Sequence, residues 1–504
     1  MLAAQLLLVL AVAVLVYSRF GIDDLLFRDE AIYAYGGQQL AEGVPPYVSI
    51  IDPKTPMATF LSGAAVAVGR AVGADDLYAI RVAFFVISCL TLVAVFIAAS
   101  LLTGSSMAGL VGAAAFLSFE GFAIDALGGP NAKTPGILFA VLATAFLLRR
   151  RWLLGGIAAS LATLVWQPLV IYVAVAIAFA WFGSERSDRR RHARSALVGA
   201  LIPGAVTVLY FIVVGAFREL FETAFVLPLF GTTRPDQGGI FDQILHIFEA
   251  VARGYGWSSL FFWAGIGFVL ALAGYRIWQA RGGYGALGRD PLIVVVAIPL
   301  LFFILFSLFD FQGYPDAYPF LPLAAFGIAT AVAIGLKLME HRGQRAVALA
   351  IAGTGAMLVV VLTWAGYGQA RPAAEALGLV AQRASAAAAD RLLGSDGTFW
   401  ALGDPSLLVL MQRRNPSPEI YMAAGVDAWV IERKPGGFDG WTAEIAAAEP
   451  DMVVLDGWHG ANAARMRQWL RSQFERIRIG ESGAFVTPEL SEEANRPVGA
   501  LLLR

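Results

Sequence analysis

Three adjacent charged residues, Arg28, Asp29 and Glu30, stand in the sequence FRDEAIYAYGGQQL, directly after the first long apolar segment. A carboxylate can take a proton from a reacting hydroxyl, and a guanidinium can neutralise an anion. The residues that follow have the pattern of a short amphipathic helix ending at Gly43. That pattern places Asp29 at the helix N-terminus, where it can act as a simple cap or as a chemical group.

The same segment continues into PPYVSIIDPKTP, where Asp52 and Lys54 lie in a turn stiffened by prolines. Lysine binds phosphate as a point charge, so Lys54 is a candidate anion ligand. It can equally be a lysine that anchors the chain at lipid headgroups. Lys54 and Lys133 are two of only four lysines among 37 basic residues, and both stand in a Lys-Thr-Pro sequence.

A second polar segment, FEGFAIDALGGPNAKTPGILF, repeats this mixture of carboxylates and lysine around a Gly-Gly-Pro turn. Its candidate binding residues are Glu120, Asp125, Asn131 and Lys133. Together the two segments predict an anion site. Gln167 can reach the same cavity from the apolar side or make a structural contact between helices.

The composition limits where these residues can lie. The chain has 504 residues, of which 58% are hydrophobic and 15% charged, and its mean hydropathy is +0.67. These values indicate an integral protein of the cell membrane whose many helices are embedded in the lipid bilayer. The net charge of -1 argues against a nucleic-acid partner. The four histidines show no metal-ligand spacing, and the single cysteine, Cys89, cannot form an intrachain disulfide.

The polar segments are separated by apolar runs long enough to be membrane spans. These lie at 2–16, 78–101, 105–120, 135–148, 153–182, 196–216, 258–278, 291–309, 318–336 and 346–366. Basic clusters stand between several of them, at 149–151, 185–194, 276–289 and 337–345. By the positive-inside rule all four clusters are cytoplasmic.

If all four basic clusters are cytoplasmic, the chain must cross the membrane an even number of times between any two of them. The run 153–182 has a basic cluster at each end and must form a hairpin, with Trp166 to Pro168 at its apex because proline breaks a helix. The run 57–73 must then be interfacial or re-entrant. The result is about eleven spans, with the N-terminus inside and the C-terminus outside.

The remaining loops then lie on the extracytoplasmic face, at 19–56, 121–134, 217–257 and 310–317. From about Arg371 an α/β pattern begins, with strand-like sequences at 397–402, 427–432 and 450–456. We therefore expect a transmembrane domain over 1–370 and a soluble extracytoplasmic α/β domain over 371–504. In the latter, His459 is expected to be an ordinary surface residue.

The motifs in these loops resemble the GT-C glycosyltransferases, in the branch of the dolichyl-phosphate-mannose protein mannosyltransferases and the bacterial aminoarabinose-lipid transferases. The matching features are Asp29-Glu30, the segment from Gly43 to Tyr47, the turn from Asp52 to Pro56, and a late Y-x-x-P sequence that begins at Tyr318. The resemblance covers roughly residues 1–366 in order and spacing.

The resemblance implies a mostly helical GT-C fold and an inverting transfer of a sugar, with mannose favoured, from a polyprenyl-phosphate donor. The acceptor would be a hydroxyl of a glycan, lipid or protein. Asp29 and Glu30 would be the catalytic carboxylates, with Asp29 as the general base. Lys54, with Lys133 and Arg28, would neutralise the departing phosphate, and Tyr47, Asp52 and Tyr318 would line the substrate site.

The sequence departs from the family at one point. Many relatives carry an acidic residue where this chain has NAKTP, around Lys133. The sequence therefore predicts no cofactor with certainty. Binding of a divalent cation stays an open alternative, and Asp29 is the residue that would hold it.

Two other functional classes also stay open: a transporter or flippase of a lipid-linked substrate, and a receptor-like protein whose external domain binds the ligand. The external domain is expected to modulate acceptor choice rather than carry chemistry.

Overall fold

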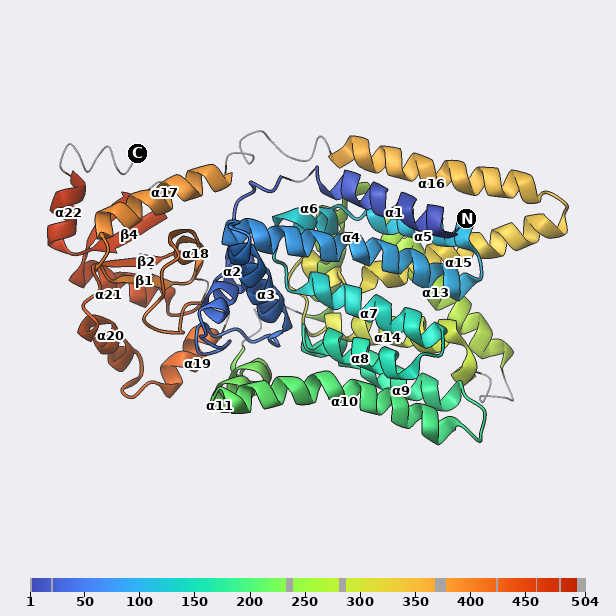
Figure 1. Ribbon diagram of the computed structural model, residues 1–504, viewed down its shortest axis with the longest axis horizontal. Helices are drawn as coiled ribbons and strands as arrows, with labels where there is room; N and C mark the ends of the chain where they lie inside the picture. The colour runs from blue at the N-terminus through green and yellow to red at the C-terminus, as the bar shows by residue number, and fades with distance from the viewer. Residues whose placement is uncertain are drawn as a thin grey trace.

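A computed structural model describes residues 2–19, 21–232, 239–280, 287–367, 378–422, 425–458, 460–479 and 482–495. Figure 1 shows a long bundle of helices with a smaller α/β unit, built from the end of the chain, against one of its ends. Helices α2 and α3 lie where the two parts meet.

The bundle contains most of the chain. Its α-helices are α1 (Leu2–Tyr17), α2 (Arg28–Ala41), α3 (Met57–Ala71), α4 (Asp76–Thr103), α5 (Ser106–Leu117), α6 (Glu120–Gly128), α7 (Lys133–Leu148), α8 (Trp152–Thr163), α9 (Ile171–Phe182), α10 (Arg189–Val213), α11 (Phe217–Phe221), α12 (Ile240–Tyr255), α13 (Ser259–Gln279), α14 (Ile298–Ser307), α15 (Phe320–His341) and α16 (Arg345–Tyr367). Short 3-10 or π-helical segments are η1 (Gln167–Val170), η2 (Glu222–Gly231), η3 (Gly256–Ser258), η4 (Leu287–Arg289), η5 (Leu292–Ala297) and η6 (Tyr314–Ala317).

The apolar helices agree with the fold class predicted from the sequence. In the described part of the chain, five helices are long and apolar enough to cross a membrane, and α5 with α6, bent by 72°, would make a sixth. Six shorter apolar helices accompany them. The mostly helical membrane fold is thus confirmed, and the number of about eleven spans stays a prediction.

The predicted hairpin within 153–182 is confirmed. The helix breaks between α8 and α9 around Trp166 and Pro168. The two outer ends of the hairpin meet, because Arg150 donates a hydrogen bond of 3.0 Å to the carbonyl of Gly183. The rings of Trp152 and Phe179 pack 5.9 Å apart near the same end. Both flanking basic clusters therefore lie on one side of the bundle.

The segment 57–73 forms α3, a helix of 15 residues. At 1.5 Å per residue it is about 22 Å long, which is shorter than the roughly 30 Å of a bilayer core. It packs against α2 and α4 next to the C-terminal unit (Figure 1). A short helix in this place is what the charge pattern predicted, while its contact with lipid stays a prediction.

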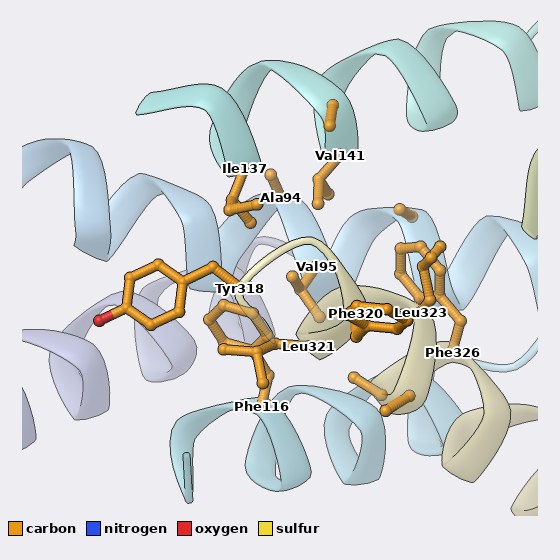
Figure 2. Close-up of a cluster of buried hydrophobic side chains, with 14 of the residues drawn as sticks. Ala94, Val95, Phe116, Ile137, Val141, Tyr318, Phe320, Leu321, Leu323 and Phe326 are labelled. Carbon is orange, nitrogen blue, oxygen red and sulfur yellow. The ribbon is translucent and has the colours of Figure 1, made fainter. Parts of the chain in front are cut away.

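The largest apolar core lies where α4, α5, α7 and α15 meet. Figure 2 shows Val95, Phe116, Val141 and Phe320 packed together with residues from these helices. Tyr318 lies at the edge of the cluster, and its hydroxyl points away from the apolar side chains (Figure 2). The core therefore holds rigidly the helices whose ends carry the polar loops.

The loops that hold the basic clusters lie far from the C-terminal unit. Figure 1 shows the start of α10 and the connection from α15 to α16 at the opposite end of the molecule. Part of the cluster at 276–289 lies outside the described residues. The structure thus separates the basic loops from the loops that carry Asp29 and Lys54, as the charge pattern requires.

The C-terminal unit is a small α/β domain that follows α16. Its helices are α17 (Gly378–Leu393), α18 (Ser406–Met411), α19 (Val426–Arg433), α20 (Gly437–Ala447), α21 (Ala463–Gln473) and α22 (Pro488–Asn495). Its strands are β1 (Phe399–Leu402), β2 (Met452–Leu455), β3 (Glu475–Ile479) and β4 (Ser482–Val486). They form one sheet in the order β1-β2-β4-β3, in which only β1 and β2 are parallel. The expected boundary near Arg371, and His459, lie outside the described residues.

Two of the three predicted strand sequences became β1 and β2, and the third prediction was wrong. Residues 427–432 lie in α19. Its buried residues include Val426, Trp429 and Val430, at the three- and four-residue spacing of a helix face rather than the alternation of a strand.

The sidedness can be tested by cysteine labelling in a Cys89→Ser background. Val48 and Ser395 are exposed near the C-terminal unit, and Gln344 is exposed in the connection from α15 to α16. We expect cysteines at Val48 and Ser395 to react with an impermeant maleimide on intact cells, and a cysteine at Gln344 to react only after permeabilisation. Labelling of Gln344 and Val48 from the same side would contradict the topology.

Candidate active site

A cavity of about 630 Å³ opens among the polar loops and is partly covered by the C-terminal domain. Six of the residues proposed from the sequence line it: Asp29, Glu30, Lys54, Asp125, Asn131 and Lys133. The other polar lining residues are Asp24, Tyr33 and Tyr314, and Gly457 comes from the C-terminal domain. The structure thus brings the first and second polar segments together, as expected for a shared site.

Asp29 and Glu30, which are neighbours in the first turn of α2, have different environments and different contacts. Phe27 is the N-cap residue, and its backbone N–H donates a hydrogen bond of 3.1 Å to Oε2 of Glu30. Glu30 is buried, whereas Asp29 is exposed and lines the cavity. The capping task that the sequence allowed for Asp29 therefore belongs to Glu30, and the Asp29 carboxylate faces the cavity.

The chain before α2 is held by a buried arginine of α4. The side chain of Arg81 is fully buried and donates hydrogen bonds to the carbonyls of Ile22 and, at 3.2 Å, Leu25. A buried guanidinium is costly unless it is hydrogen-bonded and close to an opposite charge. The acidic side chains of Glu30 and Asp23 both lie near this guanidinium. Arg81 therefore ties the start of α2 to the bundle.

The C-terminal domain holds the same segment from the other side. The side-chain amide of Gln382 accepts a hydrogen bond from Leu26 N–H (2.8 Å) and donates one to the Leu26 carbonyl (3.1 Å). Ser406 donates a further bond of 3.1 Å to that carbonyl. Leu26 is three residues before Asp29, so these contacts determine where the first turn of α2 begins.

Further contacts extend this interface along the first polar loop and to Asp75, the N-cap residue of α4. Arg383 makes two hydrogen bonds with the carboxylate of Asp75 at 3.0 and 3.1 Å. Tyr35 accepts a bond of 2.9 Å from the backbone of Asn415, and Ile51 donates one of 3.0 Å to the carbonyl of Pro418. The domain is thus part of the wall that shapes the site.

Lys54 projects into the cavity as a charged group. Its Nζ lies 2.9 Å from the hydroxyl of Tyr33, and its backbone N–H donates a bond of 3.2 Å to Oδ1 of Asp52. Burial works to lower the pKa of Lys54, but Asp52 and other acidic groups, among them Asp29, outweigh it and raise the pKa. The side chain therefore stays an ammonium at neutral pH.

Several proposed binding residues support Lys54 from outside the cavity wall. Gln167 donates hydrogen bonds to the carbonyls of Pro53 (2.7 Å) and Ala224 (2.8 Å), and Tyr47 donates one of 2.8 Å to the carbonyl of Lys54. Neither of them, nor Asp52, lines the cavity. The polar groups of these three residues hold the turn, and a direct contact with substrate stays a prediction for them.

The second polar segment is held by its own hydrogen bonds. Asn131 donates a bond of 2.7 Å to Oδ2 of Asp125. The Tyr318 hydroxyl, 2.5 Å from the same oxygen, is fully buried and does not line the cavity. In this structure Tyr318 therefore positions Asp125, and its direct contact with substrate stays a prediction.

Lys133 forms an ion pair with Asp316, a residue of η6 that the sequence did not single out. Burial works to raise the pKa of Asp316, but Lys133 and the backbone N–H groups of Gln312 and Gly313 hold it below its ordinary value. The charge of Lys133 is thus already balanced, and Lys54 is the stronger candidate for binding an anion.

Two further proposed residues fall outside this arrangement. Glu120 lines a second cavity instead of the first. The side chain of Arg28 lies outside what the structure describes, although its backbone begins α2. Among the described residues no group of three or more His, Cys, Asp or Glu side chains is arranged to hold a metal ion.

Sequence inspection missed Asp24, Tyr33, Tyr314 and Gly457 as lining residues. Asp24 had a visible signal, because it belongs to an Asp-Asp pair that precedes α2 in the polar loop. Tyr314 lies in the fourth outer loop, at 310–317, from which the sequence predicted no binding residue. Gly457 gave no signal, since only the docking of the C-terminal domain brings it to the cavity.

The arrangement combines an exposed carboxylate with an ammonium group in one cavity. Such a pair can accept a proton from a hydroxyl and neutralise a departing phosphate.

The fold was compared with solved structures. The crystal structure of ArnT from Cupriavidus metallidurans bound to undecaprenyl phosphate matches with a TM-score of 0.59 and 16% identity, over 97% of this chain and 99% of that chain. Its apo state matches with a TM-score of 0.60 and 15% identity over the same shares of the two chains. The oligosaccharyltransferase AglB from Archaeoglobus fulgidus matches with a TM-score of 0.55 and 15% identity, over 90% of this chain and 69% of that chain.

Both relatives are GT-C glycosyltransferases. The chain has the GT-C fold. No family model matches the sequence, and no curated protein matches it either. At these identities the likeness shows the fold, so the mannosyltransferase branch suggested by the motifs stays a prediction.

Gln382 offers a test of how the GT-C site is positioned. Gln382→Ala removes both side-chain hydrogen bonds to Leu26 and should let the first turn of α2 shift. We expect kcat to fall about tenfold while the Kd for donor stays unchanged, because small misplacements of a reacting group slow turnover. Gln382→Glu keeps the acceptor for Leu26 N–H and should restore part of the rate. Gln473→Ala, at an exposed position of the same domain, is the control; equal losses in the two alanine variants would contradict a positioning role.

Glu30 gives a pH-dependent test. Burial, followed by the nearby Asp125 carboxylate, raises the pKa of Glu30 well above its ordinary value, although Arg81 opposes this. Between the unfolded pKa of about 4.3 and the raised folded value, the folded state holds a proton that the unfolded state has lost. The free energy of unfolding therefore falls as pH rises through this window, by at most about 1.4 kcal/mol per pH unit.

Glu30→Gln is uncharged and keeps an acceptor for Phe27 N–H, so its thermal midpoint should decline less than that of the parent between pH 5 and pH 8. Glu492→Gln changes an exposed carboxylate and should follow the parent. Parallel pH profiles for parent and Glu30→Gln would show that Glu30 is not held protonated in the fold.

Proposed function

We propose that this protein is a membrane glycosyltransferase that moves a sugar from a polyprenyl-phosphate donor to an acceptor hydroxyl. The observation that carries the proposal is that one cavity contains both the exposed Asp29 carboxylate and the Lys54 ammonium.

The fold supports the donor class. The ArnT structure matched here contains undecaprenyl phosphate, and the AglB structure contains dolichol phosphate with an inhibitory peptide. Polyprenyl phosphates thus occur in two GT-C proteins that share this arrangement of helices. By the same analogy the acceptor is a glycan, lipid or protein hydroxyl, and mannose is the favoured sugar from the resemblance of the motifs.

In the proposed reaction the acceptor oxygen attacks the anomeric carbon from the face opposite the phosphate, which inverts the configuration. The bond from that carbon to the phosphate oxygen breaks, and polyprenyl phosphate leaves. Asp29 takes the proton of the acceptor hydroxyl as general base, and Lys54 stabilises the negative charge on the phosphate. Glu30, whose carboxylate is hydrogen-bonded to Phe27, positions Asp29 and does not react.

The site would face the extracytoplasmic side. The basic loops at 149–151, 185–194 and 337–345 lie away from the C-terminal domain, and basic loops remain cytoplasmic in membrane proteins. The cavity and the domain over 371–504 then lie outside, where a lipid-linked sugar is presented after translocation.

Two substitutions separate proton acceptance from phosphate binding. Asp29→Asn keeps the size of the side chain but cannot take the proton, so turnover should fall by about 10²–10⁴-fold with donor affinity retained. Lys54→Ala should instead weaken donor binding. Transfer of radiolabel from a panel of polyprenyl-phosphate sugars, with a parallel donor-binding assay, measures both. Full activity of Asp29→Asn would contradict the role of Asp29 as general base. Unchanged donor affinity of Lys54→Ala would contradict the role of Lys54 as phosphate ligand.

A further inference from the structure

A second polar cavity, of about 590 Å³, adjoins the first. It lies between the start of α6, one face of α12 and the segment that leads into η6, and its polar side chains are Glu120, His246, Arg253, Gln312 and Tyr314. Ile124 and Tyr314 line both cavities, so the two spaces are separated by these side chains. The proposed reaction at Asp29 and Lys54 uses none of the residues found only in the second cavity.

Tyr314 is held tightly as the wall between the cavities. A Cβ atom added to Gly254 would come within 2.3 Å of the Tyr314 side chain, and one added to Gly121 within 2.6 Å. The two glycines thus leave room for the ring from opposite helices. The Tyr255 hydroxyl also donates a hydrogen bond of 2.8 Å to the Tyr314 carbonyl. Such close packing gives the wall a defined position.

The polar groups around the second cavity carry charges of both signs, and they can make further hydrogen bonds. Glu120 is half-buried and makes no hydrogen bond or ion pair with any residue that the structure describes. Arg253 is exposed, and its guanidinium lies 3.7 Å from Glu249. His246 contacts the carbonyl of Gln312 at 3.3 Å through one ring nitrogen. A half-buried carboxylate at the wall of a cavity that is free of partners among the described residues can accept hydrogen bonds from a bound ligand in place of water.

We propose that this second cavity binds the acceptor, and that the acceptor is a glycan. The inference rests on the proposed transferase function and goes beyond it by naming the acceptor class and its site. The acceptor hydroxyl would reach Asp29 past the edge of Tyr314, because that side chain borders both cavities.

The mixture of groups favours a sugar over other acceptors. Sugar hydroxyls both donate and accept, which suits a carboxylate, a guanidinium and an imidazole in one small space. Tyr314 adds an aromatic surface beside these groups. An acceptor that presented only phosphate groups could pair with Arg253 but would meet the Glu120 carboxylate with like charge, and an apolar chain would pair with neither group.

Photolabelling tests the location directly. The probes are diazirine derivatives of gluco-, galacto-, manno- and xylo-configured disaccharides, applied to the full-length protein in membranes. We expect at least one probe to label peptides from α6 and α12, and the matching unlabelled disaccharide to compete. Undecaprenyl phosphate should not compete, since it belongs to the first cavity. Absence of labelling by every probe, labelling elsewhere, or competition by undecaprenyl phosphate would overturn the proposal.

Substitution tests the contribution of Glu120. Glu120→Gln should weaken labelling at α12 by the successful probe about tenfold, with donor binding at the first cavity unchanged. Glu492→Gln is the control, because Glu492 is an exposed carboxylate of α22 that does not line the cavity. Equal labelling by parent and Glu120→Gln, or an equal loss in the control, would overturn the role of this carboxylate in the site.

The two proposals fail in different ways. If donor binds and sugar is transferred but no disaccharide labels the second cavity, the glycan acceptor site is wrong and the transferase function stands. If a disaccharide labels α12 but no polyprenyl-phosphate sugar binds or is consumed, the glycan site stands as a binding site, while its role as acceptor site and the proposed function are both wrong.

Discussion

The anchoring of the first turn of α2 by the buried residues Leu26 and Glu30 is the constraint on which the site depends. A helix begins with backbone N–H groups that have no partner within the helix, and in a buried place each one needs an acceptor. Glu30 provides one by accepting from Phe27, and Arg81 satisfies the carbonyls of the chain just before it. Because other residues make these hydrogen bonds, Asp29 is not required for them and stays exposed at the cavity.

The C-terminal domain belongs to the same construction. Its residues Gln382 and Ser406 form hydrogen bonds with the N–H and the carbonyl of Leu26. Its residue Gly457 forms part of the cavity wall. Hydrogen bonds of this kind each contribute about 0.5–1.5 kcal/mol, and the cost of leaving their partners buried and unpaired is larger. A domain expected only to select acceptors is therefore also placed to hold the reacting helix.

Charge balance explains why two lysines in similar sequences differ. Lys133 is buried and neutralised by Asp316, so bringing a phosphate to it would first require that pair to separate. Lys54 is half-buried, its Nζ is bonded to the neutral hydroxyl of Tyr33, and nearby carboxylates keep it charged. Among the described residues of the cavity, Lys54 is thus a cation that a donor phosphate can approach without breaking an ion pair.

The sequence by itself determined the membrane class, the helix at Asp29, the hairpin at Trp166 to Pro168, the short helix at 57–73 and the grouping of Asp29, Lys54 and Asp125. These follow from local pattern, because hydrophobic runs, prolines and charge clusters act over one or two helices. Only the tertiary structure decided that Glu30 caps, that Gln167, Tyr47 and Tyr318 support rather than line the site, and that 427–432 is helical. It alone revealed Arg81, Asp316 and Gln382, because their roles depend on partners between 50 and 360 residues away in the chain. Such contacts arise when helices and domains pack, and no local pattern encodes them.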